Sequence, residues 1–177
     1  MQKVVDDARG EGAQVVIVLS HNGMDVDLKM ASRVNGIDAI MGGHTHDAVP
    51  QPVEVKTPNG GTCLVTNAGS NGKFLGVLDF DVKDGKVRDY KYKLLPVFSN
   101  LIEPDPEMTA YIEKMRNQDV TYSGKTFNMK KALEEELAVT DDLLYRRGNF
   151  NGTFDQLICD ALMAVQDAEI SFSPGFR

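Results

Sequence analysis

The sequence contains few cysteines and no long apolar run. No segment approaches the roughly 20 consecutive apolar residues that a membrane helix needs. The first residues also lack the apolar core and small-residue cleavage site of a secretory signal. The two cysteines, Cys63 and Cys159, lie far apart without a CxxC partner. This spacing predicts two buried free thiols and leaves the redox compartment open.

Positive charge is also scarce. The 177 residues carry 19 lysines and arginines against 26 aspartates and glutamates, a net charge of −7. The acidic balance argues against a nucleic-acid backbone as the main partner. It is compatible with a metal-dependent enzyme, because bound divalent cations offset local negative charge.

The first part of the chain alternates between strand and helix patterns. Residues 1–10 predict a helix, and residues 15–19 form a continuous apolar run typical of a strand buried on both faces. Asp25 is a candidate N-cap for a helix over 26–33. Residues 37–41 predict a second buried strand. A strand–helix–strand unit with short loops is typical of α/β proteins.

The pattern changes to antiparallel β structure after residue 46. The segments rich in β-forming residues cover 53–56, 63–66, 74–82 and 87–95. Asn59-Gly60-Gly61 and Asp84-Gly85 are turn signals between them. We therefore expect an antiparallel region beside the parallel strands.

A boundary is expected over residues 96–106, which hold three prolines. Asp105 followed by Pro106 is typical of an N-cap and first helical residue. The later elements predicted are a helix over 106–117, a charged helix over 130–137, an amphipathic helix over 152–165 and a strand over 168–172.

All three histidines follow predicted strands. His21 comes after residues 15–20, and His44 and His46 lie in Gly42-Gly43-His44-Thr45-His46, after residues 37–41. Open α/β sheets place their sites at the carboxyl ends of strands. The glycine pair lets the backbone take positive φ, so the two imidazoles can diverge toward two ions. The alternative is that these are ordinary hydrogen-bonded loop histidines. Candidates to orient the imidazoles are Asn22, Asp25 and Asp47.

Two of these segments resemble a known family. Leu19-Ser20-His21-Asn22-Gly23-Met24-Asp25 and the 42–46 loop resemble the last two metal motifs of the calcineurin-like metallophosphoesterases, and more narrowly of their 5′-nucleotidase branch. Residues 65–76 are similar to the glycine-rich segment that follows there. Residues 149–162 resemble the helix that opens the C-terminal domain of that branch. The resemblance covers nearly the whole chain and is weakest over 103–142.

Within the branch, the chain resembles the SoxB thiosulfohydrolases of bacterial sulfur oxidation more than nucleotidases. The resemblance lies in residues 20–27 and in 171–177, where Ser-Pro-Gly replaces the Gly-Gly-Gly of a substrate-facing loop. It implies an α/β fold of the α+β sandwich metallophosphoesterase type. The family's earlier metal motifs are absent, so an internal fragment is expected. The parts expected are the C-terminal part of the metal domain over 1–100, a helical linker over 101–140 and the beginning of the C-terminal domain over 141–177.

The resemblance also implies the cofactor and its ligands. Two divalent ions are expected, with manganese favoured and zinc or iron as alternatives, since imidazole suits all three. His21 and His44 would bind one ion, and His46 the other. The catalytic residues would lie upstream. The arginines implied to bind the substrate anion are Arg177 and, near a phosphate-binding position, Arg147 and Arg146.

The implied reaction is hydrolysis of a cysteine S-thiosulfonate on a SoxYZ-like carrier protein, which releases sulfate. The family also implies a periplasmic location, with neither nucleic acid nor membrane as a partner. Two alternatives stay open. One is a 5′-nucleotidase or related phosphoesterase that hydrolyses nucleotide phosphates, and the other is an isolated fragment that is catalytically inert.

Overall fold

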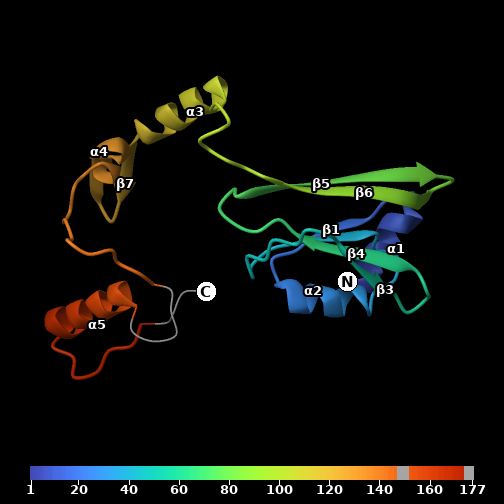
Figure 1. Cartoon of the computed structure of the whole chain (residues 1–177), viewed down its shortest axis with the longest axis horizontal. Helices are drawn as coiled ribbons and strands as arrows, with labels where there is room; N and C mark the ends of the chain where they lie inside the picture. Colours follow the sequence, from blue (N-terminus) through green and yellow to red (C-terminus); the bar gives the residue numbers. More distant parts are fainter. Residues whose placement is uncertain (147–151, 174–177) are drawn as a thin grey trace. The chain divides into compact units, whose positions relative to one another are not determined.

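The computed structural model describes residues 1–146 and 152–173. These residues divide into two compact units, Met1–Glu103 and Pro104–Arg177. The elements form a mixed α/β structure with several sheets (Figure 1). The predicted α/β class is thereby confirmed.

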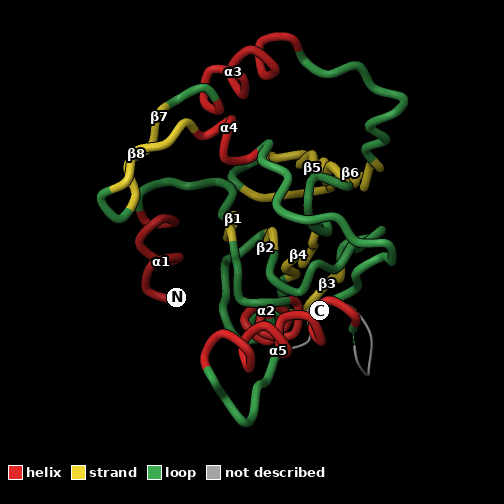
Figure 2. The backbone as a smooth tube through the Cα atoms, turned by 90° about the vertical axis from the view of Figure 1, so that its left-hand side faces the viewer, coloured by secondary structure: helices red, strands yellow, loops and turns green. Residues whose placement is uncertain are grey.

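A four-stranded sheet forms the centre of the first unit. Its strands are β1 (Ile17–Leu19), β2 (Ala39–Gly42), β3 (Val53–Lys56) and β4 (Thr62–Asn67), in the spatial order β1-β2-β4-β3. Figure 2 shows this order at its centre. β1, β2 and β4 are parallel, whereas β3 is antiparallel to β4. The predicted strand–helix–strand unit is therefore present, and the hairpin predicted around residues 59–61 joins β3 to β4.

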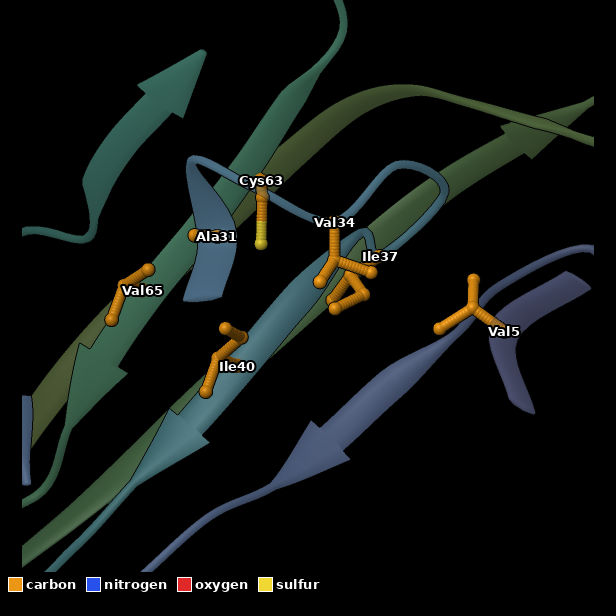
Figure 3. Close-up of a cluster of buried hydrophobic side chains, with 7 residues drawn as sticks. All are labelled: Val5, Ala31, Val34, Ile37, Ile40, Cys63 and Val65. Atoms are coloured by element: carbon orange, nitrogen blue, oxygen red, sulfur yellow. The ribbon is translucent and has the colours of Figure 1, made fainter. Parts of the chain in front are cut away.

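The hydrophobic core lies between this sheet and the first two helices, α1 (Gln2–Gly10) and α2 (Met24–Ala31). Side chains that alternate along β2 and β4 face α2, as the period of two along a strand requires. Figure 3 shows this cluster. Its buried members are Val5, Ala31, Val34, Ile37, Ile40, Cys63 and Val65.

The predicted start of α2 is wrong by two residues. The N-cap is Gly23, with φ 99°, and not Asp25. Only glycine adopts this backbone conformation without strain, and it turns the chain from the His21 loop directly into the helix. Asp25 instead lies in the first turn, where a negative charge interacts favourably with the helix dipole.

The prediction that β1 is buried on both faces is also wrong. Ile17 is 44% exposed and Leu19 82% exposed. β1 is an edge strand that pairs only with β2 among the described residues. Only the face of Val18 packs against the core, and the side chains of Ile17 and Leu19 on the other face of β1 remain exposed.

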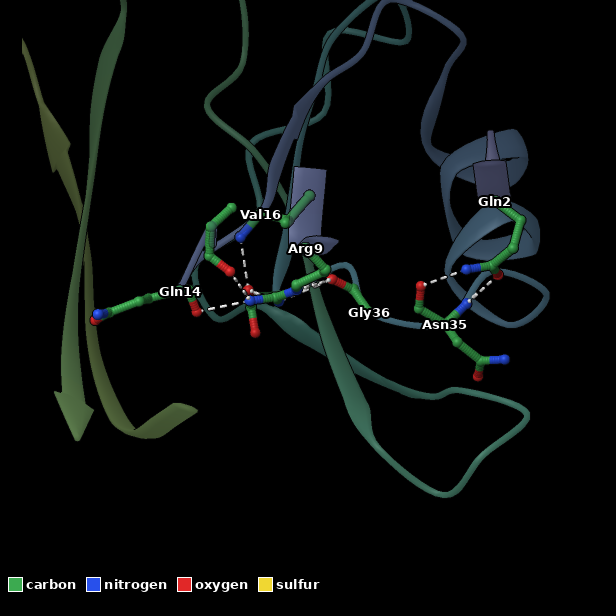
Figure 4. Close-up of polar contacts among 8 residues, drawn as sticks. Gln2, Arg9, Gln14, Val16, Asn35 and Gly36 are labelled. Carbon is green, nitrogen blue, oxygen red and sulfur yellow. Dashed lines mark hydrogen bonds and ion pairs between the residues drawn. The ribbon is translucent and has the colours of Figure 1, made fainter. Parts of the chain in front are cut away.

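Polar side chains fix α1 to the sheet (Figure 4). Arg9 donates a 2.8 Å hydrogen bond from Nη2 to the Gly36 carbonyl and forms an ion pair with Asp38. Gln2 and Asn35 exchange two bonds, of 3.0 and 2.8 Å. Since Gly36 and Asp38 lie just before β2, these contacts anchor the helix at the start of the strands.

A long antiparallel hairpin completes the first unit. β5 (Phe74–Lys83) pairs with β6 (Lys86–Pro96), as predicted, with a register shift at Asp81 and Val82. Asp84 and Gly85 between the strands have φ 53° and 71°. Two consecutive positive φ angles are typical of a tight hairpin turn. Asp and Gly adopt such angles readily, which is why Asp84-Gly85 predicted the turn correctly.

One tyrosine ties the hairpin to the four-stranded sheet. Thr66 Oγ1 on β4 donates a 2.7 Å hydrogen bond to the Tyr92 hydroxyl, which donates at 3.1 Å to the Val49 carbonyl. Thr66 is 5% exposed, so these bonds satisfy polar groups that burial would otherwise leave unpaired.

In the second unit, α3 (Pro106–Arg116) begins as predicted. The Asp105 side chain accepts a 2.8 Å hydrogen bond from the Met108 amide. The sequence did not predict the hairpin of β7 (Asp119–Tyr122) and β8 (Lys125–Asn128). Its turn is Ser123-Gly124, and both residues have positive φ.

The remaining helices are α4 (Met129–Leu133), shorter than the predicted 130–137, and α5 (Thr153–Gln166), close to the predicted 152–165. The predicted strand over 168–172 is not a strand, because no described segment pairs with it. No described helix is both long and apolar enough to cross a membrane.

The two cysteines differ in burial. Cys63 is buried as predicted, but Cys159 is only partly buried, because the face of α5 on which it lies is incompletely covered. Burial raises the pKa of the Cys63 thiol to about 12, and the charge of Asp38 adds to the rise.

Since the thiolate is the nucleophile, we expect iodoacetamide at about pH 8 to label Cys159 and spare Cys63. Peptide mass spectrometry would measure this, with the urea-unfolded chain as control; labelling of Cys63 at equal rates with and without urea would contradict the buried site.

Candidate metal site

The structure places the histidines in two adjacent loops. His21 lies two residues past β1 and His44 two residues past β2. Because these strands are neighbours and parallel, their carboxyl ends meet at one edge of the sheet. The His21 and His44 ring centroids are 5.1 Å apart, with the rings at 64°. All three histidines are exposed to solvent.

The backbone of the 42–46 loop differs from the sequence-based expectation. The residues with positive φ are His44 (76°) and His46 (60°) themselves, not the two glycines before them. A non-glycine residue in this region costs of order 1–3 kcal/mol and is held there by its surroundings.

The two glycines are needed for close approach instead. A Cβ on Gly43 would lie 3.2 Å from His21 Nδ1, and one on Gly42 would lie 2.6 Å from the Asp27 carboxylate. Without side chains at these two positions, the loop of β2 can lie directly against the loop of β1. The glycine pair thus allows the two imidazoles to approach each other.

Thr45, which the sequence reasoning did not single out, connects the loop to α2. Its hydroxyl donates a 2.6 Å hydrogen bond to Asp47 and accepts one of 3.3 Å from the Met24 amide. Its methyl group lies 3.1 Å from where a Cβ on Gly23 would be. The feature of the sequence that could have identified Thr45 is its position between His44 and His46.

The residues predicted to orient the imidazoles contact neighbouring residues. Asn22 Nδ2 donates to Ser20 Oγ at 2.9 Å, and Asp47 accepts from Thr45. Asp25 lies in the first turn of α2. These bonds shape the two loops, whereas a direct role of Asn22, Asp25 or Asp47 on an imidazole stays a prediction.

The sequence reasoning also missed a buried carboxylate beneath the loops. Asp27 on α2 is fully buried, and Ser20 Oγ donates a 2.5 Å hydrogen bond to its Oδ1. The feature of the sequence that could have identified Asp27 is its position four residues before Ala31. Residues four apart lie on the same face of a helix, and Ala31 is buried in the core.

His21 and His44 fit part of a metal site. At 5.1 Å between ring centroids, one ion can reach a nitrogen of each ring at the usual distance of about 2.0–2.1 Å. No group of three histidine, cysteine or acidic side chains in the described ranges comes together to hold an ion. Since catalytic zinc sites take three protein ligands, these two imidazoles make an incomplete site. Metal binding by all three histidines stays a prediction.

Of the predicted anion-binding arginines, only Arg146 is described, in the second unit. Arg147 and Arg177 lie outside the described residues. Arg146 forms a 3.2 Å ion pair with Asp155. A 2.7 Å hydrogen bond from Ser173 lowers the pKa of Asp155, and Arg146 lowers it further. Binding of a substrate anion by these arginines stays a prediction.

A cleft of about 820 Å³ in the first unit is at the opposite end of the strands. Arg9, Asp38 and Tyr90 are among its lining residues. Tyr90 donates a 2.8 Å hydrogen bond to Glu54, which raises the pKa of the tyrosine hydroxyl. Since the cleft contains no histidine, the candidate metal site remains at the carboxyl ends of the strands.

Comparison with known proteins shows homology to one family. No protein-family model matches the chain. A 5′-nucleotidase from Bos taurus is 28% identical over 92% of this chain and 30% of its own length. The chain is homologous to the 5′-nucleotidase and metallophosphoesterase family. It therefore spans under a third of the length of this curated relative.

Two solved structures from Thermus thermophilus support the same homology. A sulfate thiohydrolase SoxB superimposes with a TM-score of 0.69 at 32% identity, over 94% of this chain and 28% of the SoxB chain. A 5′-nucleotidase precursor superimposes with a TM-score of 0.55 at 30% identity, over 64% of this chain and 26% of the precursor. The predicted relationship to 5′-nucleotidases is thereby confirmed as homology to the 5′-nucleotidase and metallophosphoesterase family.

The close approach at the loops makes Gly42 intolerant of a side chain. Gly42→Ala would place a methyl group 2.6 Å from Asp27 Oδ2. We expect it to lower the free energy of unfolding by about 1–3 kcal/mol, the usual cost of overpacking. Urea unfolding would measure this loss. Gly10→Ala is the matched control: a Cβ there meets nothing within 4 Å, so stability should change by less than about 1 kcal/mol. Equal effects of the two substitutions would refute the close approach.

Proposed function

We propose that the chain is part of a dinuclear-metal hydrolase of the 5′-nucleotidase family, with His21 and His44 as ligands of one ion and His46 as a ligand of the other. The observation that carries this proposal is the convergence of His21 and His44, 5.1 Å apart, at the ends of two parallel strands. Homology to 5′-nucleotidases supports it. Manganese is the favoured metal, with zinc or iron as alternatives.

The chain's own residues hold the imidazoles in place. Two bound divalent cations would supply an activated water and a positive clamp for an anionic substrate. The exposed rings are accessible to solvent and therefore to a substrate. Thr45 keeps the 42–46 loop against the start of α2, so the imidazoles need little reorganisation on binding.

For the substrate we favour a cysteine S-thiosulfonate, whose hydrolysis releases sulfate. The similarity to a sulfate thiohydrolase SoxB over 94% of this chain supports this choice, since the match to the nucleotidase precursor covers only 64%. The substrate would be carried by a SoxYZ-like protein in the periplasm. Arg177, Arg147 and Arg146 remain the candidates to bind its oxyanion.

A nucleotide phosphate is the alternative substrate. The relatives named 5′-nucleotidase, including the bovine enzyme, support it. Tetrahedral phosphate and sulfonate groups carry similar oxygens, so the histidine loops suit both. The discriminating residues would be those of the substrate-facing loops.

The metal proposal is tested on the 177-residue chain with Mn²⁺. We expect His44→Ala to weaken Mn²⁺ binding, measured by isothermal titration calorimetry, by about tenfold or more, because one of two converging imidazoles is lost. Glu135→Gln, an exposed acidic residue of the second unit, is the control and should leave the affinity unchanged. Equal affinities for the wild type and His44→Ala would contradict the proposed ligand.

The substrate proposal is tested on the whole protein that contains this chain, loaded with Mn²⁺. We expect sulfate release from a protein-bound cysteine S-thiosulfonate and loss of that release in His44→Ala. Phosphate release from AMP without sulfate release would establish the nucleotidase alternative. For the 177-residue chain alone we expect neither product, because the described donors form an incomplete site. Turnover by this chain that depends on His44 would overturn the inert alternative.

A further inference from the structure

The first turn of α2 has no capping side chain of its own. Its N-cap residue is Gly23, and no side chain at that position bonds to the helix start. The start of α3 is different, because the Asp105 side chain accepts from the Met108 amide. The first amides of a helix have no partner within the helix, so they bond to side chains, to water or to a ligand. A capping side chain for α2 has to come from another segment.

That side chain belongs to the loop of His44 and His46. Thr45 Oγ1 accepts a 3.3 Å hydrogen bond from the amide of Met24, the first residue of α2. The Thr45 hydroxyl donates its own proton to Asp47 Oδ2, at 2.6 Å. A hydroxyl has one proton and two lone pairs. Because Asp47 takes the proton, a lone pair is left for the Met24 amide.

The N-cap glycine also lets this loop lie directly on the helix start. Gly23 has φ 99°, and a Cβ there would lie 3.1 Å from the Thr45 methyl carbon and 3.6 Å from His44 Cδ2. The contact between the loop and the helix therefore has an apolar part, the methyl group, and a polar part, the hydroxyl.

The end of the same turn contacts the other histidine loop. The Asp27 amide donates to the Gly23 carbonyl at 3.0 Å, which closes the turn. The Asp27 carboxylate is buried and accepts a 2.5 Å hydrogen bond from Ser20, the residue before His21. The turn is thus bonded to one loop through its first amide, that of Met24, and to the other loop through its last side chain.

The backbone around Thr45 agrees with a fixed loop. His44 and His46 have φ 76° and 60°. Residues other than glycine keep such angles only where their surroundings hold them. Thr45, between the two histidines, is held at its amide, which donates to the Gly43 carbonyl at 3.0 Å, and at its hydroxyl.

We propose that Thr45 caps α2 from outside the helix, and that the capped turn Met24–Asp27 positions the His21 and His44 imidazoles relative to each other. Thr45 is a positioning residue, since it acts through the helix start and contacts neither ion nor substrate. The inference rests on the proposed function only in taking the two imidazoles as metal ligands. Loss of the cap frees the Met24 amide and the His44 loop together.

The test separates the hydroxyl of Thr45 from its methyl group. Thr45→Val keeps a β-branched side chain of similar size and removes the hydroxyl, whereas Thr45→Ser keeps the hydroxyl and removes the methyl group. Two readouts are measured on the metal-free 177-residue chain. They are the hydrogen-exchange rate of the Met24 amide and the NOE between the ring protons of His21 and His44.

We expect Thr45→Val to exchange the Met24 amide about fivefold faster or more, as loss of a capping bond implies, and to weaken the NOE between the imidazoles. Thr45→Ser should keep both near their wild-type values. A wild-type value of either readout in Thr45→Val, or equal losses in the two variants, would overturn the proposal. Thr45 is exposed, so neither variant removes core packing. If Thr45→Val nevertheless does not fold, Asp47→Ala decides, and unchanged Met24 exchange in it would count against the cap.

Thr62→Val is the matched control. Thr62 is also an exposed threonine whose hydroxyl joins two segments, through a 3.0 Å hydrogen bond from Lys56. It is the first residue of β4 and so lies at the opposite end of the strands from the histidine loops. Its substitution should leave both readouts unchanged. Changes as large as those in Thr45→Val would show a general loosening of the chain and would contradict a specific role of Thr45.

Neither readout involves a metal or turnover. A chain that behaves as expected here and binds no Mn²⁺ would therefore contradict the proposed function alone. Wild-type readouts in Thr45→Val, together with Mn²⁺ binding that depends on His44, would contradict only the positioning role of Thr45.

Discussion

The parallel pairing of β1 with β2 is the constraint on which the candidate site depends. Ile17, Val18 and Leu19 are in register with Ala39, Ile40 and Met41. This register brings the two histidine loops out of the same edge of the sheet at adjacent positions. Any slip by one residue would turn each side chain of β1 to the other face and separate the loops. Helices α1 and α2 support this arrangement through the apolar cluster around Ile40 and the bonds of Arg9.

Close approach of the loops has a cost that is met by residue choice. Glycines at positions 42 and 43 remove the side chains that would collide with Asp27 and His21. The positive φ angles of His44 and His46 are a second cost. The polar groups beneath, Asp27 and Asn67, lie where apolar side chains would pack more simply.

Local signals predicted the second unit unevenly. Asp105 and Pro106 specify the start of α3 by themselves, because capping involves only residues a few positions apart. The hairpin of β7 and β8 escaped prediction because its strands have only four residues each and its turn, Ser123-Gly124, is a weak signal. The prediction of a strand over 168–172 was wrong because the local signal was present but the partner was not. β-forming residues become a strand only when another strand supplies hydrogen bonds, and none of the described segments does so here.

By itself the sequence determined the α/β class, the hairpin turns at residues 59–61 and 84–85, and the location of all three histidines just after strands. These follow from alternation, turn residues and apolar runs, which are properties of short segments. Only the tertiary structure decided that His21 and His44 converge, that Thr45 fastens their loop and that Asp27 lies buried beneath it. Those facts depend on strand register and on which helix face meets the sheet, and residues distant in the chain set both.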